Sequence, residues 1–172
     1  HMLIVFAAAL SLGFESECEI IELQLSEEIP FDEVKDRMNA ILPEGIEVLS
    51  CYAPQHKMGQ MGYAEYKVTL PCEKSGELHR CWNEFMSQEK ILVEKKTKRG
   101  FREIDLKEQT EFLGAEEQAD GLVLLLRLPA GSTVNVNPSL LIETFGKNQA
   151  YTFGFPKYCR QKLFSSEKTE FF

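Results

Sequence analysis

The chain contains no Cys-x-x-Cys pair, and its five cysteines are an odd number for a set of disulfide bonds. It also has only three histidines, one of them at position 1. The nearest approach to a set of zinc ligands is His79 with Cys81, joined by Cys72 and Cys51 if the fold brings them close. Because zinc ligands usually occur in tight pairs, we expect no metal and no cofactor, and reduced thiols as in a cytoplasmic protein.

Nor does the sequence contain a run of about 20 apolar residues, which a membrane-spanning helix requires. The apolar residues 3–10 have no Lys or Arg before them and are followed by Glu15, Glu17 and Glu19, unlike a secretory signal peptide. We interpret them as a strand whose natural upstream neighbour is missing, after a cloning remnant at residues 1–2. A strand without its neighbour predicts association into a homo-oligomer.

Positive charge is scarce in the first third of the chain. From His1 to His56 the only cations are Lys35 and Arg37, against eleven carboxylates. Residues 90–107 reverse this balance, with seven cations against three carboxylates. The asymmetry predicts one acidic face and one basic ridge. The net charge of −8 argues against bulk, non-specific nucleic-acid binding.

The spacing of apolar residues predicts the secondary structure of the first half. Strands are expected at residues 19–25, 46–53, 63–70 and 91–97, and helices after Pro30 and from Ser75. The second helix presents Leu78, Trp82, Phe85 and Met86 on one face. The order β-α-β-β-α-β is that of a ferredoxin-like unit, here at residues 17–97. We therefore expect the α+β class, with an antiparallel sheet and helices packed on one face.

Residues 98–164 are expected to extend this unit by a β-β-α-β portion. The expected elements are a turn at 98–100 with Gly100 at positive φ, strands at 101–106 and 121–128, an acidic loop at 111–120 and a helix. A last strand is expected to begin at residues 150–155, followed by the alternating residues 157–164. The strand at 121–128 is the most apolar and should be central. Asn137 and Pro138 start the helix, and Gly146 stops it. Residues 3–164 then form one domain with a frayed tail at 165–172.

Basic side chains gather in the expected hairpin. They are Lys95, Lys96, Lys98, Arg99 and Arg102, with Arg127 on a later strand. Cations beside an aromatic residue such as Phe101 can hold a phosphate backbone and stack a base. The alternative, which we favour, is a solvated hairpin whose lysines keep an edge strand from pairing with other chains.

A second candidate for anion binding is the loop at residues 128–138, where Ser132 and Asn135 precede a helix. Free amides at a helix N-terminus bind anions. However, the loop lacks the lysine and the spacing of a P-loop, and it fits an ordinary strand-to-helix connection better. No histidine can be named as a base for Ser11 or Ser16, so we assign no catalytic residue.

Four segments carry a family resemblance. They are FAAALSLGFESE at residues 6–17, LPEGI at 42–46, VEKKTKRG at 93–100 with Ile104 and Asp105, and LRLPAGS at 126–132 with Asn135 and Pro138. Together they resemble the radical SAM-linked domain family of unknown function. That family occurs as the C-terminal region of cobalamin-binding radical SAM proteins, or is encoded beside one. Its members carry a further N-terminal α/β portion before the region that matches Phe6, so the resemblance implies a fragment.

The resemblance also bears on function. The radical SAM cysteine motif, Cys-x-x-x-Cys-x-x-Cys, is absent from the chain. We therefore expect a non-catalytic accessory module that docks on a radical SAM protein or binds its substrate. The first alternative is a stand-alone RNA-binding domain, with tRNA as the analogy with the partner enzymes suggests. The second is a small transferase, for which nucleophile and base are lacking.

Three structural features separate these alternatives. A docking module exposes a contiguous apolar patch. An RNA-binding domain gathers the basic hairpin with Arg127 or Lys157 on one face. An enzyme has a deep polar pocket.

Overall fold

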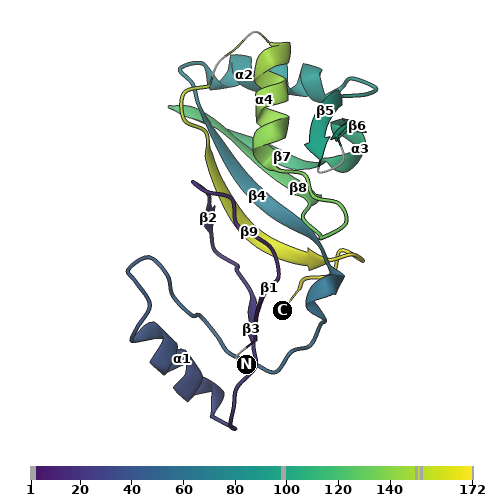
Figure 1. The fold of residues 1–172 in the computed structure, drawn as a ribbon. Helices are drawn as coiled ribbons and strands as arrows, with labels where there is room; N and C mark the ends of the chain where they lie inside the picture. The colour runs from purple at the N-terminus through teal and green to yellow at the C-terminus, as the bar shows by residue number, and fades with distance from the viewer. Residues whose placement is uncertain (1–2, 98–99, 150, 152, 172) are drawn as a thin grey trace.

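The computed structural model describes residues 3–97, 100–149, 151 and 153–171. At its centre is a five-stranded sheet with the order β2-β9-β4-β8-β7 (Figure 1). The strands are β2 (Glu15–Ser16), β9 (Lys157–Ser165), β4 (Met61–Pro71), β8 (Gly121–Pro129) and β7 (Glu111–Gln118). Neighbouring strands are antiparallel, except that β2 and β9 are parallel.

Two helices pack on one face of this sheet, α2 (Ser75–Met86) and α4 (Pro138–Asn148). Aromatic rings join them: the ring centroids of Trp82 and Phe145 lie 5.1 Å apart, and those of Phe85 and Phe145 lie 5.2 Å apart. The buried side chains of α2 are Leu78, Trp82, Phe85 and Met86, as the helical spacing predicts. The α+β class is confirmed.

Two short antiparallel ribbons lie outside this sheet. One joins β1 (Ile4–Phe6) to β3 (Ile21–Leu23), and the other joins β5 (Leu92–Thr97) to β6 (Gly100–Asp105). Gly100 has a φ of 120°, as the turn prediction requires, whereas Lys98 and Arg99 lie outside the described residues. The ferredoxin-like arrangement expected at residues 17–97 is therefore wrong, because its outer strands belong to these ribbons and not to the sheet that contains β4.

Strand β4 takes its neighbours from later in the chain, β8 on one side and β9 on the other. The inward leucines of β8 are fully buried, namely Leu122, Leu124, Leu126 and Leu128. Because β8 lies between β4 and β7, its interior position agrees with its apolar composition. Burial of this leucine row against α2 and α4 explains why the later strands, and not β3 or β5, complete the sheet.

The second half also departs from its prediction in two places. The acidic segment expected as a loop at 111–120 forms the edge strand β7, preceded by the short helix α3 (Leu106–Gln109). The tail expected to fray folds back on β9, where the Phe171 N–H donates to the Leu163 carbonyl at 2.9 Å. Phe171 is buried, and the removal of its ring from water stabilises the folded-back position of the tail.

Helix α4 begins as predicted. The Asn137 side chain accepts a hydrogen bond from the Ser139 N–H at 2.9 Å, and Pro138 takes the first helical position. Gly146 does not stop the helix, which continues past it. Glycine is needed there because a Cβ atom would lie 2.7 Å from the Tyr151 carbonyl oxygen.

Residues 3–56, called the N-terminal arm below, first run along the sheet and then leave it. Ala8 and Phe14 lie against the core, while helix α1 (Phe31–Asn39) lies beyond the end of the sheet in Figure 1. The strand expected at 46–53 does not form; the Asn39 side chain instead holds the backbone of Val48 through hydrogen bonds of 3.0 and 2.7 Å. The short helix η1 (Met58–Gln60) then leads into β4. In the described part of the chain, no helix is long and apolar enough to cross a membrane.

Candidate interaction surface on the N-terminal arm

Strand β1 has one edge paired with β3 and one free edge. The Ala7 N–H donates to the Ile20 carbonyl at 3.0 Å. Hydrogen-bonded pairs alternate along an antiparallel ladder, so the next pair, Phe6 with Ile21, is not hydrogen-bonded, and neither is the pair that contains Ile4. The backbone N–H and C=O groups of Ile4 and Phe6 therefore point away from β3. Among the described residues, none forms a hydrogen bond to these groups.

The two faces of this ribbon differ in what they contact. Ala7 and Ile20, on the inner face, pack against the core. The outer face carries the apolar side chains Ile4, Phe6, Ile21 and Leu23. Phe6 is 64% exposed and Ile4 is 45% exposed. An antiparallel ribbon normally presents polar residues on its solvent side, so this outer face is unusual.

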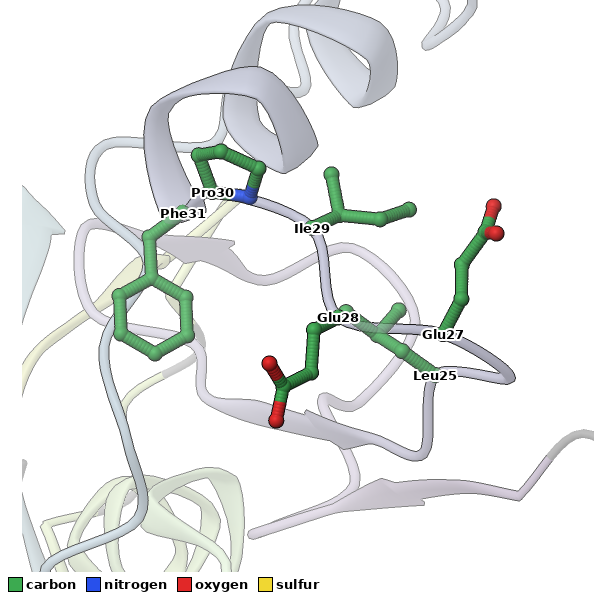
Figure 2. Close-up of a pocket in the computed structure, with 6 residues that line it drawn as sticks. All are labelled: Leu25, Glu27, Glu28, Ile29, Pro30 and Phe31. Atoms are coloured by element: carbon green, nitrogen blue, oxygen red, sulfur yellow. The ribbon is translucent and has the colours of Figure 1, made fainter.

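More apolar side chains are exposed elsewhere on the arm. They are Leu12, Leu25, Phe31, Ile41, Ile46 and Leu49. Helix α1 buries only Val34 among its described side chains. At the start of α1 a cavity of about 610 Å³ is lined by Leu25, Ile29, Pro30 and Phe31 with the carboxylates of Glu27 and Glu28 (Figure 2). The arm is thus an apolar surface bordered by acidic groups.

The net negative charge of the chain lies in the arm. Residues 1–56 hold eleven carboxylates and two cations, whereas residues 57–172 hold sixteen carboxylates and seventeen cations. Within the described residues, the arm carboxylates that form an ion pair are Glu19, with Arg160 at 2.8 Å, and Glu33, with Arg37 at 2.6 Å. The remaining carboxylates leave a strong negative potential around the apolar surface.

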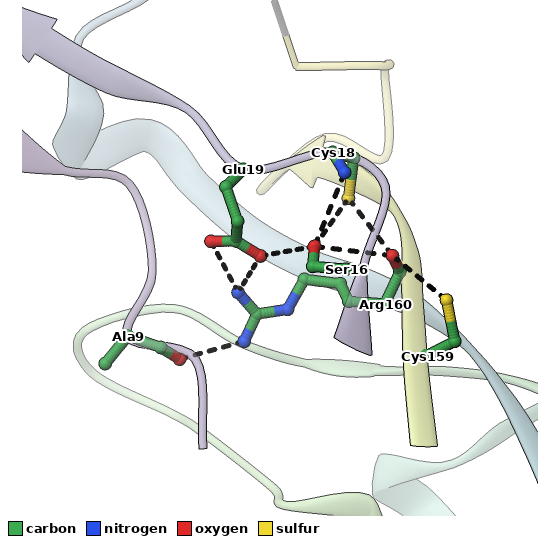
Figure 3. Close-up of polar contacts among 6 residues, drawn as sticks. All are labelled: Ala9, Ser16, Cys18, Glu19, Cys159 and Arg160. Carbon is green, nitrogen blue, oxygen red and sulfur yellow. Dashed lines mark hydrogen bonds and ion pairs between the residues drawn. The ribbon is translucent and has the colours of Figure 1, made fainter. Parts of the chain in front are cut away.

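An ion pair between the buried Arg160 and the partly exposed Glu19 anchors the arm to the sheet (Figure 3). The side chain of Arg160, on β9, is 3% exposed, and its Nη1 donates to both Glu19 carboxylate oxygens at 2.8 and 3.1 Å. Its Nη2 donates to the Ala9 carbonyl at 2.9 Å. Ser16 donates to Glu19 at 2.5 Å, and the ring of Tyr66 lies 5.7 Å from the guanidinium carbon. These contacts fix the place where the ribbon leaves the sheet.

The basic hairpin of β5 and β6 packs its base on the core. Val93 and Ile104 face each other across the hairpin and lie against the core. Two residues nearer the tip, Lys95 and Arg102 face each other on the same side. Lys95 Nζ donates to the carbonyl of Asn135. The structure thus brings together two of the predicted anion-binding regions, the hairpin and the loop before α4.

Arg127 does not join this group of cations. Its Nη2 bonds to Glu65 at 2.6 Å and its Nη1 to Glu111 at 3.1 Å, while its guanidinium lies 4.5 Å from the ring centroid of Phe164. Two carboxylates therefore offset its charge. Of the other predicted residues, Ser132 is exposed on its loop, Lys96 belongs to β5, and Lys98 and Arg99 lie outside the described residues.

The described residues offer few side chains that are placed for catalysis or for metal binding. Ser16 bonds to the Glu19 carboxylate, and His79 Nδ1 bonds to Glu117 at 2.7 Å. Burial raises the pKa of the Cys18 thiol to about 11, which keeps it protonated and unreactive at neutral pH. Among the described residues, no group of three or more His, Cys, Asp and Glu side chains is placed to hold a metal ion. A second cavity, of about 520 Å³ beside α4, is lined mainly by apolar and aromatic residues.

The chain folds as an α+β domain. Its N-terminal arm carries a net negative charge and also exposes several apolar side chains. A family model described as "Uncharacterized protein conserved in bacteria (DUF2344)" matches residues 1–138. Since the match covers most of the chain, the chain belongs to this bacterial family. It matches no curated protein and no solved structure.

Proposed function

We propose that this chain is a non-catalytic docking module whose N-terminal arm binds a protein partner. The outer face of the β1–β3 ribbon carries the proposal, because Ile4, Phe6 and Ile21 are exposed there beside Leu23. A contiguous apolar patch bordered by charged residues is typical of a protein interaction site. Burying these side chains against a partner would stabilise a complex by removing their surface from water.

The charge of the arm indicates what the partner surface should look like. With eleven carboxylates against two cations in residues 1–56, the arm would repel an acidic surface. A partner that offers an apolar patch with basic residues around it matches both the apolar and the electrostatic pattern. Charge complementarity of this kind also speeds association.

The resemblance of the segments at 6–17, 42–46, 93–105 and 126–138 to the radical SAM-linked domain family supports a radical SAM protein as this partner. Because the chain lacks the Cys-x-x-x-Cys-x-x-Cys motif, its part in such a cytoplasmic complex would be accessory, by docking or by presenting a substrate.

RNA binding through the basic hairpin has weaker support. The hairpin keeps Lys95 and Arg102 on one side. However, Lys95 already donates to the Asn135 carbonyl, and the charge of Arg127 is offset by Glu65 and Glu111. The transferase alternative is weaker still, because among the described residues no Ser, Cys or His side chain lines either cavity.

The test is a binding measurement with the radical SAM protein purified from the same bacterium. Calorimetry should show binding by the intact chain and a loss of about tenfold or more in affinity when Phe6 and Ile21 are both changed to Ser. Phe155→Ser is the matched control: Phe155 is 90% exposed but lies outside the arm, so affinity should stay within about twofold. Circular dichroism would confirm that each variant is folded. Equal affinity for all three chains would refute the docking surface.

A further inference from the structure

We infer that the partner adds a β-strand to the free edge of β1 and so extends the β1–β3 ribbon. This inference rests on the proposed function, since it assigns the way in which the same partner is held. An exposed sheet edge binds an extended segment through main-chain hydrogen bonds, and the alternate side chains give specificity.

The backbone groups needed for this pairing are in place. Ile4 and Phe6 direct their N–H and C=O groups away from β3, and within the described residues these groups form no hydrogen bond. Their spacing of two residues is the repeat with which an antiparallel partner strand exchanges hydrogen bonds. Val5, between them, faces β3 and is already paired in the ribbon.

The edge of β1 also lacks the usual protection against pairing. Natural edge strands carry charges, proline or bulges that discourage the addition of another strand. Residues 3–14 contain no charged residue and no proline. The edge strand β7, in contrast, contains Glu111, Glu116 and Glu117 and a register shift between Phe112 and Gly114. The outer edge of β9 is partly covered by β2 and by the returning tail.

The composition of the added strand follows from its surroundings. Its side chains on the outer face would continue the row of Ile4 and Phe6, so they should be apolar. Its flanks should be basic, because Glu22 lies opposite Val5 across the ribbon and forms no ion pair within the described residues, and residues 1–56 hold eleven carboxylates against two cations. A second copy of this chain fits less well, since two arms with eleven carboxylates each would repel one another.

A synthetic peptide, Lys-Val-Thr-Val-Thr-Val-Lys, serves as the probe. Amide hydrogen exchange of the isotope-labelled chain, followed by NMR, should slow about tenfold or more at Ile4 and Phe6 when the peptide is added, with little change at Val5. A copy of the peptide N-methylated at alternate amides has lost the donors that the ladder needs and should give no protection. A copy with Glu in place of Lys should bind more weakly because of the acidic arm.

Two variants at one position separate the backbone from the side chain. Ile4→Pro removes the outward N–H, and proline is tolerated on an edge whose N–H faces solvent, so the ribbon should remain folded. Peptide affinity should fall about tenfold or more. Ile4→Thr keeps the donor and a β-branched side chain, and its affinity should stay within about threefold. The remaining amide signals would verify the fold of both.

Each contrary result has a defined meaning. No protection at Ile4 and Phe6, or equal peptide binding by Ile4→Pro, overturns strand addition. Protection that grows with protein concentration and without peptide assigns the edge to a second copy. The same exchange measurement can be made on the protein in its natural length, without peptide. Slow exchange at Ile4 and Phe6 there assigns the edge to another segment of the same chain. If Ile4→Pro still binds the radical SAM protein while the Phe6→Ser, Ile21→Ser variant does not, strand addition fails and the docking surface stands.

Discussion

Arg160 and Glu19 are 141 residues apart in the sequence and 2.8 Å apart in the structure. Arg160 belongs to the central sheet, and Glu19 precedes the β3 strand of the arm. The pair therefore connects the core to the apolar ribbon. Since the Arg160 side chain is almost fully buried, its guanidinium depends on Glu19 and on the Ala9 carbonyl to replace water.

Removing the charge of Glu19 should destabilise the chain substantially. Glu19→Gln leaves the buried Arg160 cation without its counter-charge; because Glu19 is partly exposed and solvent screens the pair, the expected loss in the free energy of unfolding is about 2 kcal/mol. Glu33→Gln is the control, because Glu33 pairs with Arg37 on an exposed helix face and should cost less than about 0.5 kcal/mol. Urea unfolding followed by circular dichroism measures both. Equal losses would mean that the Arg160–Glu19 pair contributes no more than a surface pair.

Alkaline pH should weaken the fold through Cys18. Burial raises the pKa of its thiol from 9.0 to about 11, so the folded chain holds this proton more tightly than the unfolded chain does. The stability that Cys18 contributes is therefore fully present below pH 9 and is lost as the pH rises toward about 11. The free energy of unfolding should fall more steeply above pH 9 for the native chain than for Cys18→Ala. At neutral pH the thiol is protonated in both states, and the two pH slopes should agree; parallel curves above pH 9 would contradict the assignment.

Two glycines on neighbouring strands should respond oppositely to alanine. A Cβ atom at Gly121 would lie 2.7 Å from the Leu70 carbonyl oxygen, whereas one at Gly114 would meet nothing within 4 Å. Gly121→Ala should therefore cost about 2 kcal/mol or more by displacing β8 from β4. Gly114→Ala should be neutral or stabilising by up to about 1 kcal/mol, because alanine restricts the unfolded chain. Thermal unfolding of the two variants checks this, and a stable Gly121→Ala would show that the two strands can separate easily.

The sequence correctly predicted the structural features that depend on residues close together in the chain. The buried face of α2, the start of α4 at Asn137 and Pro138, and the interior place of β8 all follow from spacing, capping and composition. Strand pairing did not follow, because alternation identifies a strand without identifying its partner. The strand around Ile21 was therefore assigned to the wrong sheet.

The candidate surface was predicted only in part. Charge counting identified the acidic arm, but the exposure of Phe6 depends on which face of the ribbon packs on the core. The buried Arg160 was missed for a related reason. In a regular strand Arg160 and Lys162 would share a face, but a register shift between Glu65 and Tyr66 separates them. Arg160 is therefore buried, whereas Lys162 lies opposite Glu65 and is exposed.

The intact chain should give no band shift with the tRNA pool of its host, even at low salt. Docking through an apolar arm involves no phosphate contacts, and the basic hairpin lacks the support of Arg127, which is held by Glu65 and Glu111. If a shifted complex did appear, its dependence on salt would identify the cause. Each phosphate contact to a single strand gives a log–log slope of about −0.7. Changing Lys95 and Arg102 to Glu should then abolish the shift, while Lys147→Glu on α4 should leave it unchanged. A steep salt slope together with that pattern of variants would establish RNA binding by the hairpin and would count against the docking proposal.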